Sequence, residues 1–315
     1  MFAPVQDRLA SFETRLAEVL RSDVAFIEAI GEDLAGAGGK RLRPALSFLA
    51  ADLIGADGED AMRVALAVEL LHSASLLHDD LIDDAETRRG HEAAFRRYGN
   101  VVSVMSGDFL LARVLGLLAD AGDAAFTRRM SRTAAAICEG EVLQFQMATL
   151  ETWSLDAYRR VIEGKTAELL ATAMEGPALL AGRSDEVREA LRTFGMAYGR
   201  AFQMQDDHLD LLGDPEALGK PVGGDLREGK ATYPVLWLLQ EGCDEAADIL
   251  RRHAHDPGDV ARIRALVAEH GADVATRDVI EAEANAAVDA LASFEEGPAK
   301  RTLLALARRE IDRTR

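Results

Sequence analysis

Apolar residues recur every three to four positions over long stretches of this 315-residue chain. The spacing is clear over 64–76, and it returns over 162–170 and over 235–239. Such a period is typical of helices with one buried face, whereas strands alternate at every second residue. Alternating segments are nearly absent, and aromatic residues make up only 5% of the chain. The pattern predicts an all-α protein with roughly ten or more helices.

The breaks between the expected helices fall at segments rich in glycine, proline and charged residues. The richest break spans 211–234. No serine- and glycine-rich linker divides the chain, and 315 residues can bury one large core. We therefore expect residues 1–315 to form a single helical domain.

The charge and the cysteine content exclude several classes of protein. With 36 Lys+Arg against 54 Asp+Glu, the net charge of −18 argues against binding to nucleic acid or to an anionic membrane surface. The only cysteines, Cys138 and Cys243, cannot form a disulfide framework, and we expect Cys138 to be buried and inert. The sequence shows no signal peptide and no run of about 18 apolar residues. A cytoplasmic protein without a transmembrane segment is expected.

Two clusters of aspartates share one spacing. The first acidic cluster lies in LLHDDLIDD and the second in FQMQDDHLD, and their members are Asp79, Asp80, Asp83, Asp206, Asp207 and Asp210. Crowded carboxylates among apolar residues repel one another unless cations lie between them. Mg²⁺ prefers such oxygen ligands and is usually completed by substrate phosphates. A solvated helix end explains one cluster but poorly explains two, so we predict that the clusters face each other and hold several Mg²⁺ ions around a diphosphate.

Basic residues lie near both clusters in a chain that is otherwise acidic. GGKRLRP combines a glycine loop with a helix start, which favours an anion. Each basic residue also has an ordinary explanation, such as a solvated lysine, an arginine paired with a nearby acid or a histidine in the core. No serine or cysteine has the surroundings of an activated nucleophile. The candidates for an anion site are Lys40, Arg41, Arg43, His72, Arg88, Arg89, Lys165, Thr166, Lys220 and Lys230.

Five motifs, taken together, resemble those of the trans-polyprenyl diphosphate synthases. They are GGKRLRP, ELLHSASLLHDDLIDDAETRRG, GKT, AFQMQDD-x-x-D and GKPVGGD-x-x-x-GK-x-T-x-P, and they occur in the family's order. The resemblance implies an isoprenoid-synthase-type helical bundle around a deep central cavity, normally a homodimer. It also implies head-to-tail condensation of isopentenyl diphosphate with an allylic diphosphate, through a carbocation formed with the help of Mg²⁺.

The resemblance further implies roles for single residues. The six aspartates would bind Mg²⁺. Contact with the allylic substrate would come from Arg88, Lys165, Thr166, Gln203, Lys220 and Lys230. The diphosphate of isopentenyl diphosphate would be bound by Lys40, Arg43, His72 and Arg89. The chain departs from many relatives at 91–93, where His-Glu-Ala replaces a proline and a small hydroxyl residue, and the shape of that loop stays open.

The length of the product would depend on the residues before the first acidic cluster. Ala74 and Ser75 are small, whereas short-chain members carry a bulky residue near here that closes the tunnel. We therefore expect a long-chain product, although small residues also permit close helix packing. The alternatives are a geranylgeranyl or farnesyl diphosphate synthase and the catalytic subunit of a heteromeric synthase.

Three further rivals fit less well. A terpene cyclase would carry a different second metal motif and would lack GGKRLRP. A non-catalytic partner subunit would tend to lose one acidic cluster. A calcium-buffering acidic protein would not need the ordered basic residues.

Overall fold

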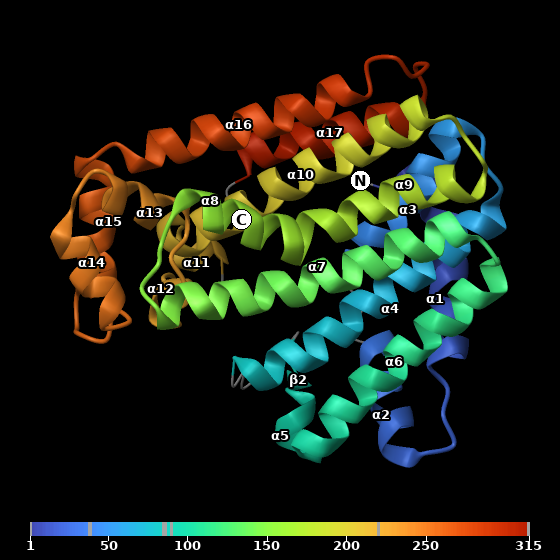
Figure 1. Cartoon of the computed structure of the whole chain (residues 1–315), viewed down its shortest axis with the longest axis horizontal. Coiled ribbons are helices and arrows are strands. Elements are labelled where there is room, and N and C mark those ends of the chain that lie inside the picture. Colours follow the sequence, from blue (N-terminus) through green and yellow to red (C-terminus); the bar gives the residue numbers. More distant parts are fainter. Residues whose placement is uncertain (1, 37–39, 84–86, 89–90, 219–220, 314–315) are drawn as a thin grey trace. The chain divides into compact units, whose positions relative to one another are not determined.

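The computed structural model of the chain describes residues 2–36, 40–83, 87–88, 91–218 and 221–313, with the backbone alone at 87, 88, 91 and 217. These residues are almost entirely helical (Figure 1), so the predicted all-α fold is confirmed. The strands within the described ranges are β1 (Thr87–Arg88) and β2 (His91–Glu92), which pair antiparallel. The sequence predicted only a loop here, because two residues per strand are too few to show an alternating pattern.

The chain is divided into two compact units. Unit 1 comprises Met1–Ala134, Thr172–Arg192 and Phe294–Leu303, and unit 2 comprises Ala135–Ala171, Thr193–Ser293 and Leu304–Arg315. The first acidic cluster belongs to unit 1 and the second to unit 2. The single domain expected from the sequence stays a prediction, as does the facing arrangement of the two clusters.

Unit 1 is built around one buried helix, α4. The helices of the chain up to α6 are η1 (Ala3–Val5), α1 (Gln6–Leu20), α2 (Ala25–Gly36), α3 (Leu42–Ile54), α4 (Gly58–Ile82), α5 (Ala94–Tyr98) and α6 (Asn100–Ala121). Asp57 caps α4 by accepting a hydrogen bond from the Glu59 N–H at 2.7 Å. From Ala61 to Leu71 nearly every residue of α4 is buried, with α3 and α6 packed against it. Apolar residues on all sides identify a core helix.

Unit 2 contains the second acidic cluster and much of the chain after the first part of α7. The remaining elements of the chain are α7 (Ala124–Thr149), α8 (Leu155–Ile162), the π-helical turn η2 (Glu163–Ala167), α9 (Glu168–Leu180), α10 (Asp185–Leu212), α11 (Pro215–Leu218), α12 (Gly224–Arg227), α13 (Tyr233–Gln240), α14 (Asp244–Arg251), α15 (Asp259–Glu269), α16 (Ala272–Ala290) and α17 (Pro298–Asp312). By sequence, α7, α9, α10 and α17 contribute residues to both units.

Glycines on α10 let this helix approach η2 and α9 closely. A Cβ atom on Gly199 would lie 2.5 Å from the Cα of Ala167, and one on Gly195 would lie 2.4 Å from the Cα of Ala171. No side chain fits at such distances, so the contact depends on glycine facing alanine. The approach determines which side chains of α10 can reach those of η2.

The exposure of Cys138 differs from the prediction. The thiol is exposed, not buried. The buried positions of this part of α7 are Met130, Thr133, Ile137 and Gly140. Cys138 follows Ile137 directly and is therefore turned by about 100° away from the buried face.

One helix in the described part of the chain, α6, is long and apolar enough to cross a membrane by length and composition alone. A third of its most apolar window, 33%, is buried inside the protein. Core and interface helices of soluble proteins pass the same test, so this helix is weak evidence for a membrane span.

Candidate active site

Asp207 of α10 lies at the centre of the candidate site and is buried. Both of its carboxylate oxygens accept hydrogen bonds: the Tyr158 hydroxyl donates to Oδ2 at 2.7 Å, and Nε2 of Gln203 donates to Oδ1 at 2.8 Å. Burial raises the pKa of Asp207 to about 6, although both hydrogen bonds act in the opposite direction. The site therefore holds a carboxylate that ionises near neutral pH.

Asp225 of α12 adds a half-buried acid to the second acidic cluster. Its backbone N–H donates to Oδ2 of Asp210 at 3.0 Å, and the Gly223 N–H donates to the Asp210 carbonyl at 2.6 Å. Gly223 has a φ of +78°, in the left-handed region that favours glycine. Burial, together with the charges of Asp207 and Asp210, raises the pKa of Asp225 to about 8. The segment after α10 is thus folded onto the aspartates.

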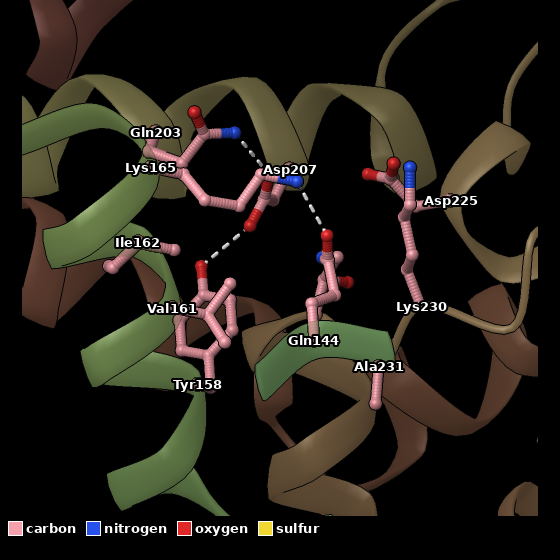
Figure 2. A pocket seen from close by; sticks show the side chains of 11 residues that line it. Gln144, Tyr158, Val161, Ile162, Lys165, Gln203, Asp207, Asp225, Lys230 and Ala231 are labelled. Carbon is pink, nitrogen blue, oxygen red and sulfur yellow. Dashed lines mark hydrogen bonds between the residues drawn. The ribbon is translucent and has the colours of Figure 1, made fainter. Parts of the chain in front are cut away.

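Two lysines line the same cavity as Asp207 (Figure 2). Nζ of Lys165 donates to Oε1 of Gln144 at 2.6 Å and forms an ion pair with Glu141 at 2.7 Å. Nζ of Lys230 pairs with Glu228 at 2.6 Å. The cavity has a volume of ≈ 200 Å³ and is also lined by Tyr158, Gln203 and Asp225 among others. Four predicted site residues, Lys165, Gln203, Asp207 and Lys230, therefore meet in one cavity.

Lys165 and Thr166 belong to η2, a π-helical turn. Such turns are rare and are often found at functional sites. The Thr166 hydroxyl donates to Oε1 of Gln203 at 2.7 Å, so Thr166 acts on the cavity through Gln203. The close approach of α10 at Gly199 makes this contact possible.

A second pocket of ≈ 360 Å³ adjoins the cavity and shares Gln203, Asp207 and Asp225 with it. Its other lining residues include Asp206, Asp210 and Arg313. Four carboxylates therefore border one pocket, together with one guanidinium.

The donor chemistry of this pocket fits a divalent cation. Buried carboxylates that repel one another are stabilised when a cation binds between them. In the described residues, no group of three or more Asp, Glu, His or Cys side chains is arranged to hold a metal ion by itself. Mg²⁺ usually keeps several waters and binds oxygens of a phosphate substrate, so the protein does not have to supply all of its ligands.

The first acidic cluster lies at the C-terminal end of α4 in unit 1. Asp79 is half-buried and Asp80 is buried, while Asp83 is exposed and ends the helix, its N–H donating to the Asp79 carbonyl at 2.8 Å. Ala74, which precedes the cluster by about one turn, is buried. The Ser75 hydroxyl donates to the carbonyl of half-buried His72 at 2.9 Å.

The basic residues of the predicted anion site before α3 differ in exposure and in pairing. Lys40 is exposed, and Arg43 is half-buried in the first turn of α3. Arg41 between them is buried and pairs with Glu13 at 2.7 Å and with Glu69 at 2.9 Å, which makes it structural. Only the backbone of Arg88 is described, and Arg89 and Lys220 lie outside the described residues.

Four residues that line the site were not predicted from the sequence. Tyr158 precedes Lys165 by nearly two helical turns, so its position on the same face was a usable signal. Asp225 stands inside a quoted motif without a role of its own. Gln144 of α7 and Arg313, which follows α17, come from distant parts of the chain, and nothing local in the sequence marks them.

Comparisons with known proteins point to one family. The polyprenyl synthetase family model matches residues 24–270. The chain is 37% identical to an all-trans-nonaprenyl-diphosphate synthase (geranyl-diphosphate specific) of Rhodobacter capsulatus, covering 99% of this chain and 97% of the relative. It is 36% identical to the octaprenyl diphosphate synthase of Escherichia coli, covering 98% and 96%. A polyprenyl synthase of Caulobacter crescentus, solved with calcium and isoprenyl diphosphate, superposes with a TM-score of 0.91 at 39% identity, covering 99% and 97%.

Proposed function

The chain belongs to the polyprenyl synthetase family, and we propose that it condenses isopentenyl diphosphate head-to-tail with an allylic diphosphate to form a polyprenyl diphosphate. The observation that carries the proposal is the single cavity in which Asp207 lies with Lys165, Gln203 and Lys230. A diphosphate leaving group requires positive charge around its oxygens. Divalent ions held by carboxylates supply part of this charge, and ammonium groups that bind phosphate oxygens supply the rest.

The aspartates of both acidic clusters are the proposed ligands of Mg²⁺: Asp79, Asp80, Asp83, Asp206, Asp207 and Asp210. When bound, divalent ions neutralise the charge that develops on a departing diphosphate. Tyr158 and Gln203 hold the carboxylate of Asp207 in one orientation. Lys165 and Lys230 add positive charge at the same cavity. Lys40, Arg43, His72 and Arg89 are the proposed ligands of isopentenyl diphosphate, and Arg88, Thr166 and Lys220 complete the allylic site.

The proposed reaction breaks the allylic C–O bond, which leaves a carbocation and a diphosphate anion. The double bond of isopentenyl diphosphate attacks the cation and forms the new C–C bond. A proton is then lost to the departing diphosphate, which restores the double bond. Water would convert the cation into an alcohol, so the site must exclude it. The segment 221–232, which folds onto Asp210 through Gly223 and Asp225, is placed to help with this.

We propose a long-chain product. The support is the similarity to nonaprenyl and octaprenyl synthases over nearly the whole chain and the small side chains of Ala74 and Ser75 before the first acidic cluster. A shorter product or a heteromeric enzyme are the competing outcomes.

We also propose that the enzyme is a cytoplasmic homodimer. The homodimer is supported by the apolar face of α6, where Val101 is 76% and Leu115 is 67% exposed. A second copy of the chain would cover these side chains and remove them from water.

A single incubation tests the proposed function. Purified protein receives Mg²⁺, labelled isopentenyl diphosphate and, in separate reactions, geranyl, farnesyl or geranylgeranyl diphosphate, and the dephosphorylated products are sized. We expect labelled lipids of long chain length, and no product after chelation of the metal or in D79A and D206A. Unlabelled lipid fractions with every primer would contradict the proposal, whereas one short product would contradict only the chain length.

A further inference from the structure

A guanidinium from the end of the chain lies on the second acidic cluster. Nη1 of Arg313, the residue after α17, pairs with Oδ1 of Asp206 at 2.6 Å. Arg313 also lines the pocket that Asp206, Asp207, Asp210 and Asp225 border. A proposed metal ligand therefore already carries a cation supplied by the protein.

Several contacts hold Arg313 on this part of α10. Its carbonyl accepts a hydrogen bond from Nε2 of the buried Gln205 at 2.6 Å, and its guanidinium carbon lies 5.3 Å from the centre of the Phe202 ring. Its Nη1 also pairs with buried Glu310 at 3.2 Å. Arg313 is thus anchored by two residues of α10 and one of α17, and its side chain is only 13% exposed.

The charge of Arg313 has a direct consequence for metal binding. A carboxylate offers about four lone-pair positions on its two oxygens, so Asp206 has room for both a guanidinium and a metal ion. The positive charge nonetheless repels a divalent ion that approaches the same carboxylate. Because Arg313 is anchored, this repulsion persists while the ion is bound.

We propose that Arg313 is the resident counter-cation of Asp206 and a positioning residue of the second acidic cluster, where it weakens the binding of divalent ions. This inference rests on the proposed function, since it takes Asp206 to be a metal ligand. The arrangement keeps the cluster compact before substrate arrives, and it makes the cluster depend on a diphosphate for full occupancy.

Mn²⁺, used in place of Mg²⁺ because electron paramagnetic resonance reports its free concentration, tests this directly without substrate. We expect R313Q to bind Mn²⁺ about fivefold more tightly than the parent, since one repelling charge is removed from a partly exposed site. The matched control is R308Q, which removes the same charge from an exposed position on α17 and should leave the affinity unchanged.

Two further comparisons separate this role from a structural one. R313Q removes the cation that pairs with the buried carboxylate of Glu310, and this loss alone could unfold the protein. We therefore also compare E310Q with E310Q/R313Q. The double variant should bind Mn²⁺ about fivefold more tightly than E310Q. In a D206N background, R313Q should tighten Mn²⁺ binding less than in the parent, because the ion pair that places the Arg313 charge on this ligand is absent. Circular dichroism confirms that each variant is folded.

An unchanged or weaker Mn²⁺ affinity in folded R313Q and in E310Q/R313Q would overturn the inference. So would an equal effect of R308Q, an undiminished effect of R313Q in D206N, or a parent protein that binds no Mn²⁺. The proposed function fails separately, because a protein that binds Mn²⁺ as expected and yet forms no prenyl product contradicts that function alone.

Discussion

The position of Asp207 among the lining residues of the cavity makes its carboxylate buried. The same carboxylate must be ionised to bind a metal ion. Burial disfavours the ionised form, and the hydrogen bonds from Tyr158 and Gln203 favour it. The resulting pKa of about 6 leaves Asp207 mostly ionised at neutral pH. The hydrogen bonds from Tyr158 and Gln203 therefore determine the pH below which Asp207 is protonated and no longer available to bind a metal ion.

Replacing Tyr158 by phenylalanine should move the pH dependence of the reaction. Y158F removes a donor to Asp207 and so raises the pKa of this carboxylate above about 6. The acid side of the profile of kcat/KM should move to higher pH by roughly one unit, since one hydrogen bond to a charged group contributes about 1.5 kcal/mol. Rates of prenyl transfer over a range of pH measure the effect.

The control for this change is Y233F. The Tyr233 ring lies 6.2 Å from that of Tyr158, and the structure shows no hydrogen bond from its described side chain to Asp207. Its profile should match that of the parent. An unmoved profile in Y158F would show that ionisation of Asp207 does not limit the reaction.

At the scale of the element, η2 depends on close packing against α7. A Cβ atom on Gly164 would lie 2.5 Å from the carbonyl oxygen of Ala136. G164A should therefore lower the free energy of unfolding by about 1–3 kcal/mol. Because Lys165 follows directly, the substitution should also reduce kcat. Urea unfolding and steady-state rates measure the two effects.

Gly58, at the first position of α4, provides the matched control because nothing lies within 4 Å of a Cβ atom built there. G58A should change stability by no more than about 0.5 kcal/mol. Equal stabilities of G164A and G58A would contradict the argument from close packing.

The end of α4 is where product length should be set. S75F places an aromatic ring at a half-buried position before the first acidic cluster and should shorten the main product. S75A removes the hydroxyl bond to the His72 carbonyl without adding volume, and it should leave the length unchanged. Chromatography of the dephosphorylated lipids gives the lengths, and identical products from S75F and the parent would refute the assignment.

The elements show what the sequence could and could not predict. The helical period marks α4 and α13, because the apolar residues that produce it over 64–76 and over 235–239 lie within one helix each. The six aspartates stand at recognisable spacings for the same reason. The contact of Thr166 with Gln203 instead requires Gly199 to meet Ala167, which lies in another helix. The placement of Arg313 on Asp206 likewise joins distant parts of the chain, and no local pattern contains it.

At the scale of the molecule, the acidic pocket should make the metal-free protein sensitive to pH. Asp207 and Asp225 have pKa values of about 6 and about 8 in the folded protein, both above the value of about 3.9 expected in the unfolded chain. The folded state therefore holds these protons more tightly. The stability that they contribute is complete below about pH 4 and is lost as the pH rises through about 6 and then about 8.

D225N tests the upper part of this range. In the metal-free protein, D225N should raise the melting temperature by about 3 °C near pH 9, where the native aspartate is ionised, and change it little near pH 5. D278N, at an exposed position of α16, should have no such effect. Calorimetry with a chelator measures the difference, and a shift of equal size at both pH values would contradict the assignment to the ionisation of Asp225.

The apolar face of α6 predicts the oligomeric state. Val101, Met105 and Leu115 lie on one exposed side of the helix, as their spacing of four and ten residues requires. Covering them in a homodimer removes their apolar surface from water, whereas two glutamates in M105E/L115E would bury charge there. Light scattering should give the mass of two chains for the parent and of one chain for M105E/L115E, with unchanged helical content.

V274E, which alters an apolar side chain that is 60% exposed on α16, should remain a dimer. A monomeric parent would contradict the proposed dimer, and recovery of the parent in the membrane fraction would assign the apolar face of α6 to lipid instead.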